Sequence, residues 1–300
     1  MENRRVAPWT AIGTKIEGTT TVAEALEKGR LDWQINQIPL IHAGINTGYM
    51  MNVRDIDENV LGVVGKRYKP VQNVEAFQFV EELIGEGVTF EMVGATNNAK
   101  RVWLLAKLPD TTILGEPVDP YICLTNSHDG FGSLKVFMTP LRVFCSNMIN
   151  LALTNSNRMW SVRHTGSINA KLHEAQRTMG LATNYMNHLN LEAEQLVKIK
   201  IAPKQYDALS AQLFPITTEM SSRKEQSQLL LREELDKAWK MDDLGSIRNT
   251  GWGFVNAVSD MVTHKEPARK TENSRENAFM YHLDEPIVLN TAYKLVKELV

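Results

Sequence analysis

The amino-acid sequence predicts an α+β fold, with an antiparallel β-meander packed with helices in the first half and a mostly helical second half. Three observations lead to this prediction. Short apolar runs separated by Asn, Gly and Asp occupy much of the first 140 residues, as in strands joined by turns. Apolar residues at helical spacing dominate after about residue 165. With 43% hydrophobic and 23% charged residues, the composition is that of a soluble globular protein.

The first half is assigned from caps, turns and periodicity. Thr21 can cap a short helix over 22–28 that ends at Gly29, and residues 33–64 are expected to form strands joined by turns. Asn73 can cap a helix that Gly85 ends. Further strands are expected over 88–93, 101–108, 120–125 and 133–138. After Pro140, apolar residues up to Leu153 predict a buried helix.

The second half is predicted to be helical, with one long polar loop. Helices are expected over 167–187, 191–199, 203–213, 221–240, 250–262 and 287–299. Residues 263–277 are rich in Lys, Arg, Glu and Asn and are expected to form the loop. The predicted division is an α+β domain over 1–165 and a mainly helical region over 166–300, with a helix able to bridge the two.

Several classes of protein are excluded by what the sequence lacks. No apolar run approaches the roughly 18 residues of a membrane helix, so no membrane partner is expected. Cys123 and Cys145 are too few for a disulfide framework or a zinc site, which favours a reducing compartment. Nucleotide-binding, zinc-protease and serine-hydrolase motifs are missing. The sequence therefore predicts no cofactor and no catalytic residue.

Charge is distributed unevenly along the chain, although its formal net value is only −2. Residues 131–190 carry a single acid, Glu174, and six basic residues: Lys135, Arg142, Arg158, Arg163, Lys171 and Arg177. Aromatic residues, including Trp160, are interleaved with them, and a smaller basic stretch contains Lys66, Arg67 and Tyr68. Cations among aromatic rings suit a single-stranded nucleic acid. The alternative is a set of ordinary solvated charges, with Trp160 in the core.

Two arginines stand where the predicted structure changes. Arg163 and His164 lie where a loop enters a helix, so a cation and the free N–H groups of a helix start could hold a phosphate. Arg142 is flanked by apolar residues and needs a partner if it is buried. That partner could be Asp129 or a phosphate.

Three segments, His128-Asp129-Gly130, residues 139–147 and residues 163–166, resemble a phage- and plasmid-borne family known as domain of unknown function nine-three-two. The resemblance covers most of the chain. It implies a mobile-element origin and the cytoplasm of a bacterial host cell, and it supplies no catalytic residues. A meander followed by a helix is also similar in architecture to phage single-strand annealing proteins of the RecT and Red beta type. Those proteins form rings or filaments around single-stranded DNA without nucleotide or metal chemistry.

The predicted function is binding of single-stranded DNA by a phage protein that forms a homo-oligomer, a ring or filament, and anneals complementary strands. The expected interface consists of Lys66, Arg67, Tyr68, Lys135, Arg142, Arg158, Trp160, Arg163, His164, Lys171 and Arg177. In it, cations neutralise phosphates, and Tyr68 or Trp160 stacks on bases. Two alternatives stay open. One is an accessory protein that binds a host defence or replication factor, and the other is a nucleic-acid enzyme with His128 and Asp129 as metal ligands.

Overall fold

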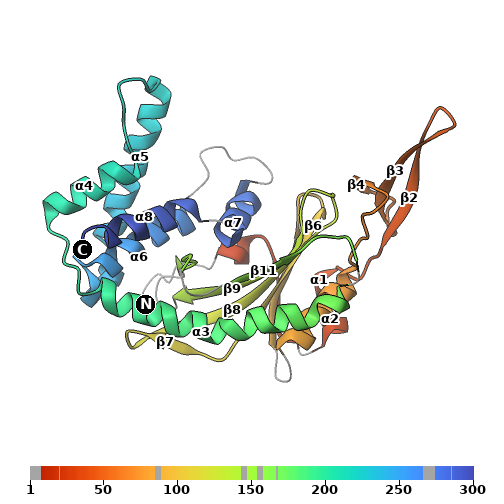
Figure 1. Cartoon of the computed structure of the whole chain (residues 1–300), viewed down its shortest axis with the longest axis horizontal. Coiled ribbons are helices and arrows are strands. Elements are labelled where there is room, and N and C mark those ends of the chain that lie inside the picture. The colour runs from red at the N-terminus through yellow and green to blue at the C-terminus, as the bar shows by residue number, and fades with distance from the viewer. Residues whose placement is uncertain are drawn as a thin grey trace.

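A computed structural model describes residues 8–19, 21–84, 89–142, 147–153, 158–166, 168–265, 274–284 and 286–300. Within them, the main sheet is antiparallel and has the strand order β1-β5-β6-β8-β9-β10, with β7 beside β8 and β11 beside β9 (Figure 1). Its strands are β1 (Thr14–Thr19), β5 (Thr89–Thr96), β6 (Arg101–Lys107), β7 (Thr111–Ile113), β8 (Glu116–Ser127), β9 (Leu134–Arg142), β10 (Asn147–Met148) and β11 (Met159–Val162).

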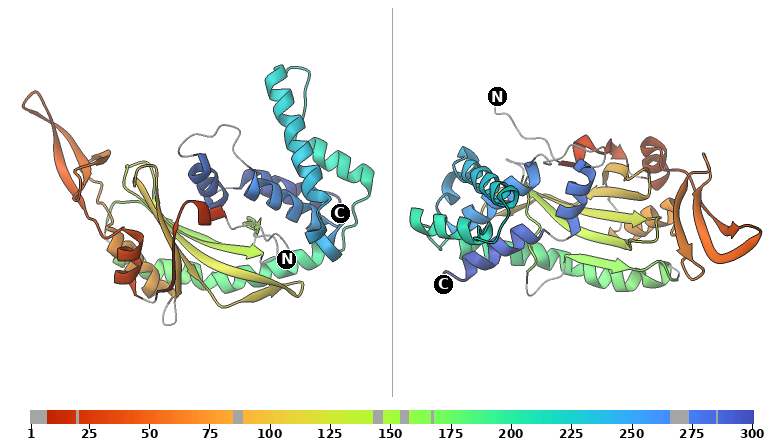
Figure 2. Two further views of the ribbon diagram at one scale, coloured as in Figure 1. Left: turned by 180° about the vertical axis from the view of Figure 1, so that it is seen from behind. Right: turned by 90° about the horizontal axis from the view of Figure 1, so that it is seen from above.

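A second, three-stranded sheet projects from the main body. It consists of β2 (Ile35–His42), β3 (Ile45–Arg54) and β4 (Val60–Gly65), all antiparallel. Ala43 and Gly44 both have positive φ, 49° and 78°, as the tight turn of a twisted hairpin requires. Figures 1 and 2 show β2 and β3 extending as an arm away from the main sheet.

Helices cover the main sheet and build the second half. Those before the meander are η1 (Pro8–Ala11), α1 (Val22–Gly29) and α2 (Asn73–Ile84). Those after it are η2 (Asn169–Lys171), α3 (Leu172–Leu196), α4 (Pro203–Leu213), α5 (Ser222–Trp239), η3 (Asp242–Ile247), α6 (Gly251–His264), α7 (Ser274–Asp284) and α8 (Ile287–Lys297). The predicted α+β class, with a meander in the first half and helices in the second, is therefore confirmed.

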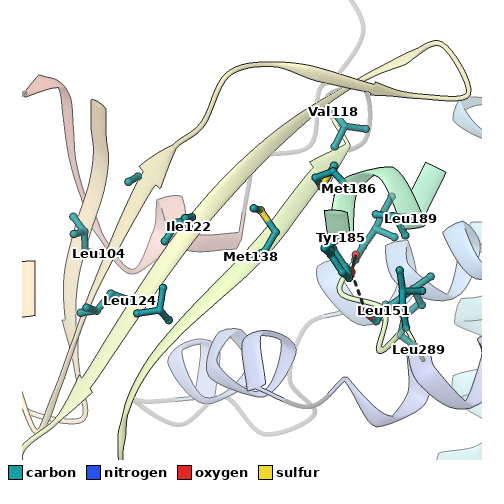
Figure 3. Close-up of a cluster of buried hydrophobic side chains, with 14 of the residues drawn as sticks. Leu104, Val118, Ile122, Leu124, Met138, Leu151, Tyr185, Met186, Leu189 and Leu289 are labelled. Carbon is teal, nitrogen blue, oxygen red and sulfur yellow. Dashed lines mark hydrogen bonds between the residues drawn. The ribbon is translucent and has the colours of Figure 1, made fainter. Parts of the chain in front are cut away.

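The two faces of the main sheet carry separate cores because strand side chains alternate. On β6, Val102 and Leu104 belong to the larger core, whereas Trp103 and Leu105 belong to a smaller one with Trp9 and residues of α7. The larger core also contains residues of α2, α3, α6 and α8, so it runs across residue 165. Figure 3 shows it between the sheet and α3, where the Tyr185 hydroxyl donates a hydrogen bond to the Leu151 carbonyl (3.0 Å).

The predicted helix after Pro140 is wrong where the structure describes it. Strand β9 continues through Pro140 to Arg142, β10 pairs with its end, and 149–153 form neither helix nor strand. Pro140 lies opposite Pro120 of β8. Spacing alone did not distinguish buried irregular chain from a buried helix, since both are apolar. Residues 143–146 and 154–156 lie outside the described residues.

Three other expectations change. The stretches 167–187 and 191–199 share one helix, α3, within the described residues. Strand β1 lies before Thr21, in a stretch for which the sequence predicted no element. Helix α7 begins inside the predicted loop, and its Phe279 packs against Trp103 with ring centroids 5.2 Å apart. Such tertiary packing, rather than local periodicity, accounts for α7.

Candidate functional site

An open hollow of about 1500 Å³ lies where the projecting sheet meets the main sheet. Segments far apart in sequence line it: the chain after β4, the β8–β9 turn, and β11 with the turn that follows. The lining residues are Gly48, Gly65, Lys66, Arg67, Tyr68, Lys69, Gly130, Phe131, Gly132, Ser133, Ser161, Arg163, His164 and Thr165. Two of the stretches predicted to bind nucleic acid, 66–68 and 163–164, therefore meet in space.

The charged side chains that line the hollow are positive. Lys66, Arg67 and Lys69 are exposed on the segment after β4, and Arg163 is exposed beyond β11. Among the described residues that line the hollow there is no Asp or Glu. The nearby Asp129 carboxylate is engaged in the β8–β9 turn, where its Oδ1 accepts hydrogen bonds from Ser127 Oγ (2.6 Å) and the Phe131 amide (2.8 Å). Clustered cations of this kind favour an anionic ligand.

Tyr68 holds the segments of the hollow together. Its ring stacks on the His164 imidazole, with centroids 4.8 Å apart, and its hydroxyl donates to the Ser127 carbonyl (2.8 Å). The Lys69 amide donates to the His164 carbonyl (2.8 Å). Burial raises the pKa of Tyr68, so the phenol stays a neutral donor at physiological pH. These contacts fix the backbone on both sides of the hollow, and this backbone carries the neighbouring cations Arg67, Lys69 and Arg163.

The β8–β9 turn places an aromatic ring at the edge of the hollow. Gly130 has a φ of +85°, a conformation that glycine adopts without strain. A Cβ at Gly62 of β4 would lie 2.5 Å from the Asp129 carbonyl oxygen, so only glycine permits this close approach. In the turn that these two glycines make possible, Phe131 is 94% exposed. Sequence reasoning missed Phe131, although an aromatic residue between two turn glycines is the signal that could have identified it.

A buried polar layer supports the hollow from beneath. Asn52 Nδ2 donates to the His128 carbonyl (2.8 Å), and His128 Nε2 lies 3.0 Å from Asn73 Oδ1. Burial lowers the pKa of His128 to about 3, and that of His164 to about 4. Both imidazoles are therefore neutral at pH 7. Neither ring nitrogen of His164 has a hydrogen-bond partner among the described residues.

His128 and Asp129 do not join further metal-ligating side chains in the part of the chain that the structure describes. No group of three or more His, Cys, Asp and Glu side chains placed to hold a metal ion is found there. The His128 imidazole is buried and pairs with Asn73.

The structure buries Arg142, Arg158 and Trp160 of the predicted interface, and the predicted His164 imidazole beside the hollow is buried as well. Arg142 forms an ion pair with Glu116 (2.6 Å) rather than with Asp129, and it donates to the Asp243 carbonyl (3.2 Å).

The other two side chains are equally enclosed. Arg158 donates to the Leu283 carbonyl (3.0 Å), and the Trp160 ring stacks on Phe79 with centroids 5.1 Å apart. Trp160 belongs to the larger core, as the alternative interpretation of this residue expected.

The remaining predicted cations, Lys135, Lys171 and Arg177, are not among the lining residues of the hollow. Lys171 and Arg163 both line a smaller recess of about 50 Å³, and Lys171 also pairs with Glu174 (3.0 Å). Lys135 is half-buried on β9, opposite Ser161 of β11. Arg177 is exposed on α3.

Comparisons with known proteins give one result. The sequence model of a family described as Domain of unknown function (DUF932) matches residues 60–282. No curated protein and no solved structure matches the chain. The similarity to phage annealing proteins therefore stays a prediction. No helix within the described residues is long and apolar enough to cross a membrane.

Proposed function

This chain belongs to the DUF932 family, whose description states no activity, and from the hollow itself we propose that the protein binds single-stranded DNA. The observation that carries this proposal is that Lys66, Arg67, Lys69 and Arg163 line one hollow together with the exposed Phe131, and that no acid is among the described residues of its lining.

The chemistry of these groups fits a single strand better than a duplex. Lysine and arginine side chains neutralise backbone phosphates irrespective of base sequence. An exposed aromatic ring stacks on an unpaired base, which a duplex keeps within its own stack. Phe131 is the stacking residue in this proposal, in place of Trp160. The phosphates follow the exposed cations from Lys66 to Arg163, and Lys171 beside Arg163 extends this path.

Annealing of complementary strands is the second part of the proposal. A strand held by its phosphates, with only some bases stacked on protein, leaves base edges free to pair with a second strand. Such a protein needs no nucleotide for this step, and a homo-oligomer would present several hollows to one strand. A phage or other mobile element is the proposed source of the gene, and the bacterial cytoplasm is the proposed location.

Fluorescence anisotropy of a labelled single-stranded oligonucleotide, with the matching duplex as control, tests the binding proposal. We expect tighter binding of the single strand, and log K should fall with log salt at a slope of about −0.7 for each phosphate contacted. Contacts from the four cations of the hollow correspond to a slope of roughly −3. Arg163→Ala and Lys66→Ala should each make the slope shallower by about 0.7.

Matched controls are available at the other end of the molecule. Lys204 and Lys224 are exposed on α4 and α5, far from the projecting sheet (Figure 1). Lys204→Ala and Lys224→Ala remove the same charge and should leave affinity and slope unchanged. Absence of binding at low salt, or equal effects of the hollow and control variants, would overturn the proposal.

A further inference from the structure

The projecting sheet exposes an apolar face that nothing in the described chain covers. Ile38 of β2, Met51 of β3 and Val63 of β4 lie opposite one another in register, and Tyr49 lies two residues from Met51 on the same face. Three of these side chains are about half exposed: Ile38 by 44%, Tyr49 by 55% and Val63 by 50%. Adjacent exposed apolar side chains on a sheet typically mark a contact surface.

The opposite face of the same sheet is already occupied. Gln37 Nε2 donates to Asn52 Oδ1 (3.2 Å), and Asn52 in turn contacts the His128 backbone. Gly62 and Val64 of β4 approach the β8–β9 turn. Because side chains alternate along each strand, Ile38, Met51 and Val63 point away from the body of the protein. The apolar face is therefore free while the polar face holds the sheet in place.

Charge indicates what kind of partner this face accepts. Residues 35–53 and 60–65 contain no Asp, Glu, Lys or Arg. The cation of these three strands, Arg54 at the end of β3, is paired with Asp57, so a nucleic acid or an anionic lipid surface would find no unpaired cation here, whereas a second neutral apolar face meets no charge repulsion. A copy of the same face satisfies this condition, and a two-fold axis brings identical patches together.

The edge of the sheet is less suited to self-association than its face. β2 pairs only with β3 among the described strands, and it contains Pro39, a residue without a backbone N–H that is typical of edge strands and unfavourable for further strand pairing. Beyond β4 the arm has only two strands, a structure that is marginally stable in water by itself. Packing of one arm against another would stabilise both.

We propose that the outer face of the projecting sheet, centred on Ile38, Tyr49, Met51 and Val63, is the two-fold contact between two copies of this chain. The two sheets pack face to face about 10 Å apart, with these side chains interdigitated. This inference does not depend on nucleic-acid binding. The hollow lies at the base of each sheet, so a dimer carries two hollows.

Sedimentation equilibrium over a range of protein concentrations tests the proposal. We expect wild-type protein to form a dimer, and Tyr49→Lys with Val63→Lys to give a monomer. Leu229→Lys on α5 is the matched control, since Leu229 is 51% exposed at the other end of the molecule, and it should leave the dimer intact. A wild-type monomer, or a dimer that survives the double substitution, overturns the proposal.

A milder pair of substitutions tests the same contact in a variant that is expected to fold normally. Ile38→Thr with Val63→Thr keeps β-branched residues that strands favour while placing hydroxyls in the contact. At concentrations where both proteins are monomeric, we expect this variant and the wild type to have the same melting temperature. The dissociation constant of the variant dimer should be raised roughly tenfold or more. An unchanged dissociation constant overturns the proposal. Anisotropy with a short oligonucleotide, run on the monomeric variant, reports separately on the hollow, so failure of either proposal can be recognised.

Discussion

The Tyr68 ring stacks on the His164 ring, and this contact joins two segments that are almost one hundred residues apart in sequence. The cations flanking these rings, Arg67 and Lys69 on one side and Arg163 on the other, are thereby held around one hollow. Neutral aromatic groups thus position the charges that we assign to phosphate binding.

Phe131→Ala should weaken binding of single-stranded DNA by about 1–3 kcal/mol, the range for loss of one stacked base. The melting temperature should stay unchanged because the side chain is 94% exposed. Anisotropy and thermal unfolding measure the two effects. Phe131→Trp keeps a stacking surface and should retain affinity. Equal affinity of the alanine variant and the wild type would remove Phe131 from the interface.

Gly62→Ala should lower the free energy of unfolding by about 1–3 kcal/mol and weaken DNA binding. The added Cβ would meet the backbone of Asp129, with its carbonyl oxygen at 2.5 Å and its Cα at 2.6 Å, and would displace the β8–β9 turn. Gly65→Ala is the matched control because no atom lies within 4 Å of its added Cβ. Urea unfolding compares the two variants, and equal stability would contradict the close approach at Gly62.

Stability should decrease as pH falls below about 6.5. Burial lowers the pKa of His128 to about 3 and of His164 to about 4, although the Asp129 carboxylate acts in the opposite direction on both. The unfolded chain then binds protons that the folded chain excludes, so acid favours unfolding, and the loss is complete only below the folded pKa values. For His164 the loss is on the order of 3 kcal/mol by pH 4.

His164→Phe separates this effect from general acid denaturation. Phenylalanine can still stack on Tyr68 and carries no titratable group, and it replaces an imidazole whose nitrogens have no hydrogen-bond partner among the described residues. We expect a flatter stability profile between pH 6.5 and pH 4, measured by urea unfolding at each pH. His42→Phe, on the exposed arm, should leave the profile unchanged. A His164→Phe profile identical to that of the wild type would contradict the prediction.

Arg142→Ala should lower the free energy of unfolding by about 3–5 kcal/mol, since it leaves Glu116 without its partner at a largely buried ion pair. Lys171→Ala removes the exposed pair with Glu174 and should cost less than about 1 kcal/mol. Chemical denaturation measures both. Unchanged stability of Arg142→Ala together with loss of DNA binding would return Arg142 to the interface.

Local signals were sufficient for the elements whose ends are set by nearby residues. The Thr21 side chain accepts a hydrogen bond from the Glu24 amide (3.3 Å), and Thr250 accepts one from the Gly253 amide (3.1 Å). The predicted cap Thr21 therefore marks an observed helix start, and Thr250, where the helix over 250–262 was predicted to begin, is the N-cap of α6. Helix α4 has the predicted bounds because a proline begins it.

Burial of the arginines could not be deduced in the same way. Arg142 donates to Asn256, 114 positions further along the chain (3.4 Å), and no pattern around residue 142 encodes that neighbour. The stretches 66–68 and 163–164 could be identified as short basic stretches from the local sequence, and their role in binding nucleic acid stays a prediction. Their proximity to each other depends on the pairing of β9 with β11 and on the Tyr68–His164 stack.

The larger core, which runs from α1 to α8, constrains how this gene can be shortened or recombined. A fragment ending near residue 165 would lose the apolar side chains of α3, α6 and α8 that share the larger core with Leu104 and Met138. Exchange of the C-terminal helices between relatives would have to preserve this shared surface. Inheritance of the meander and the helices as one block is the expected evolutionary result.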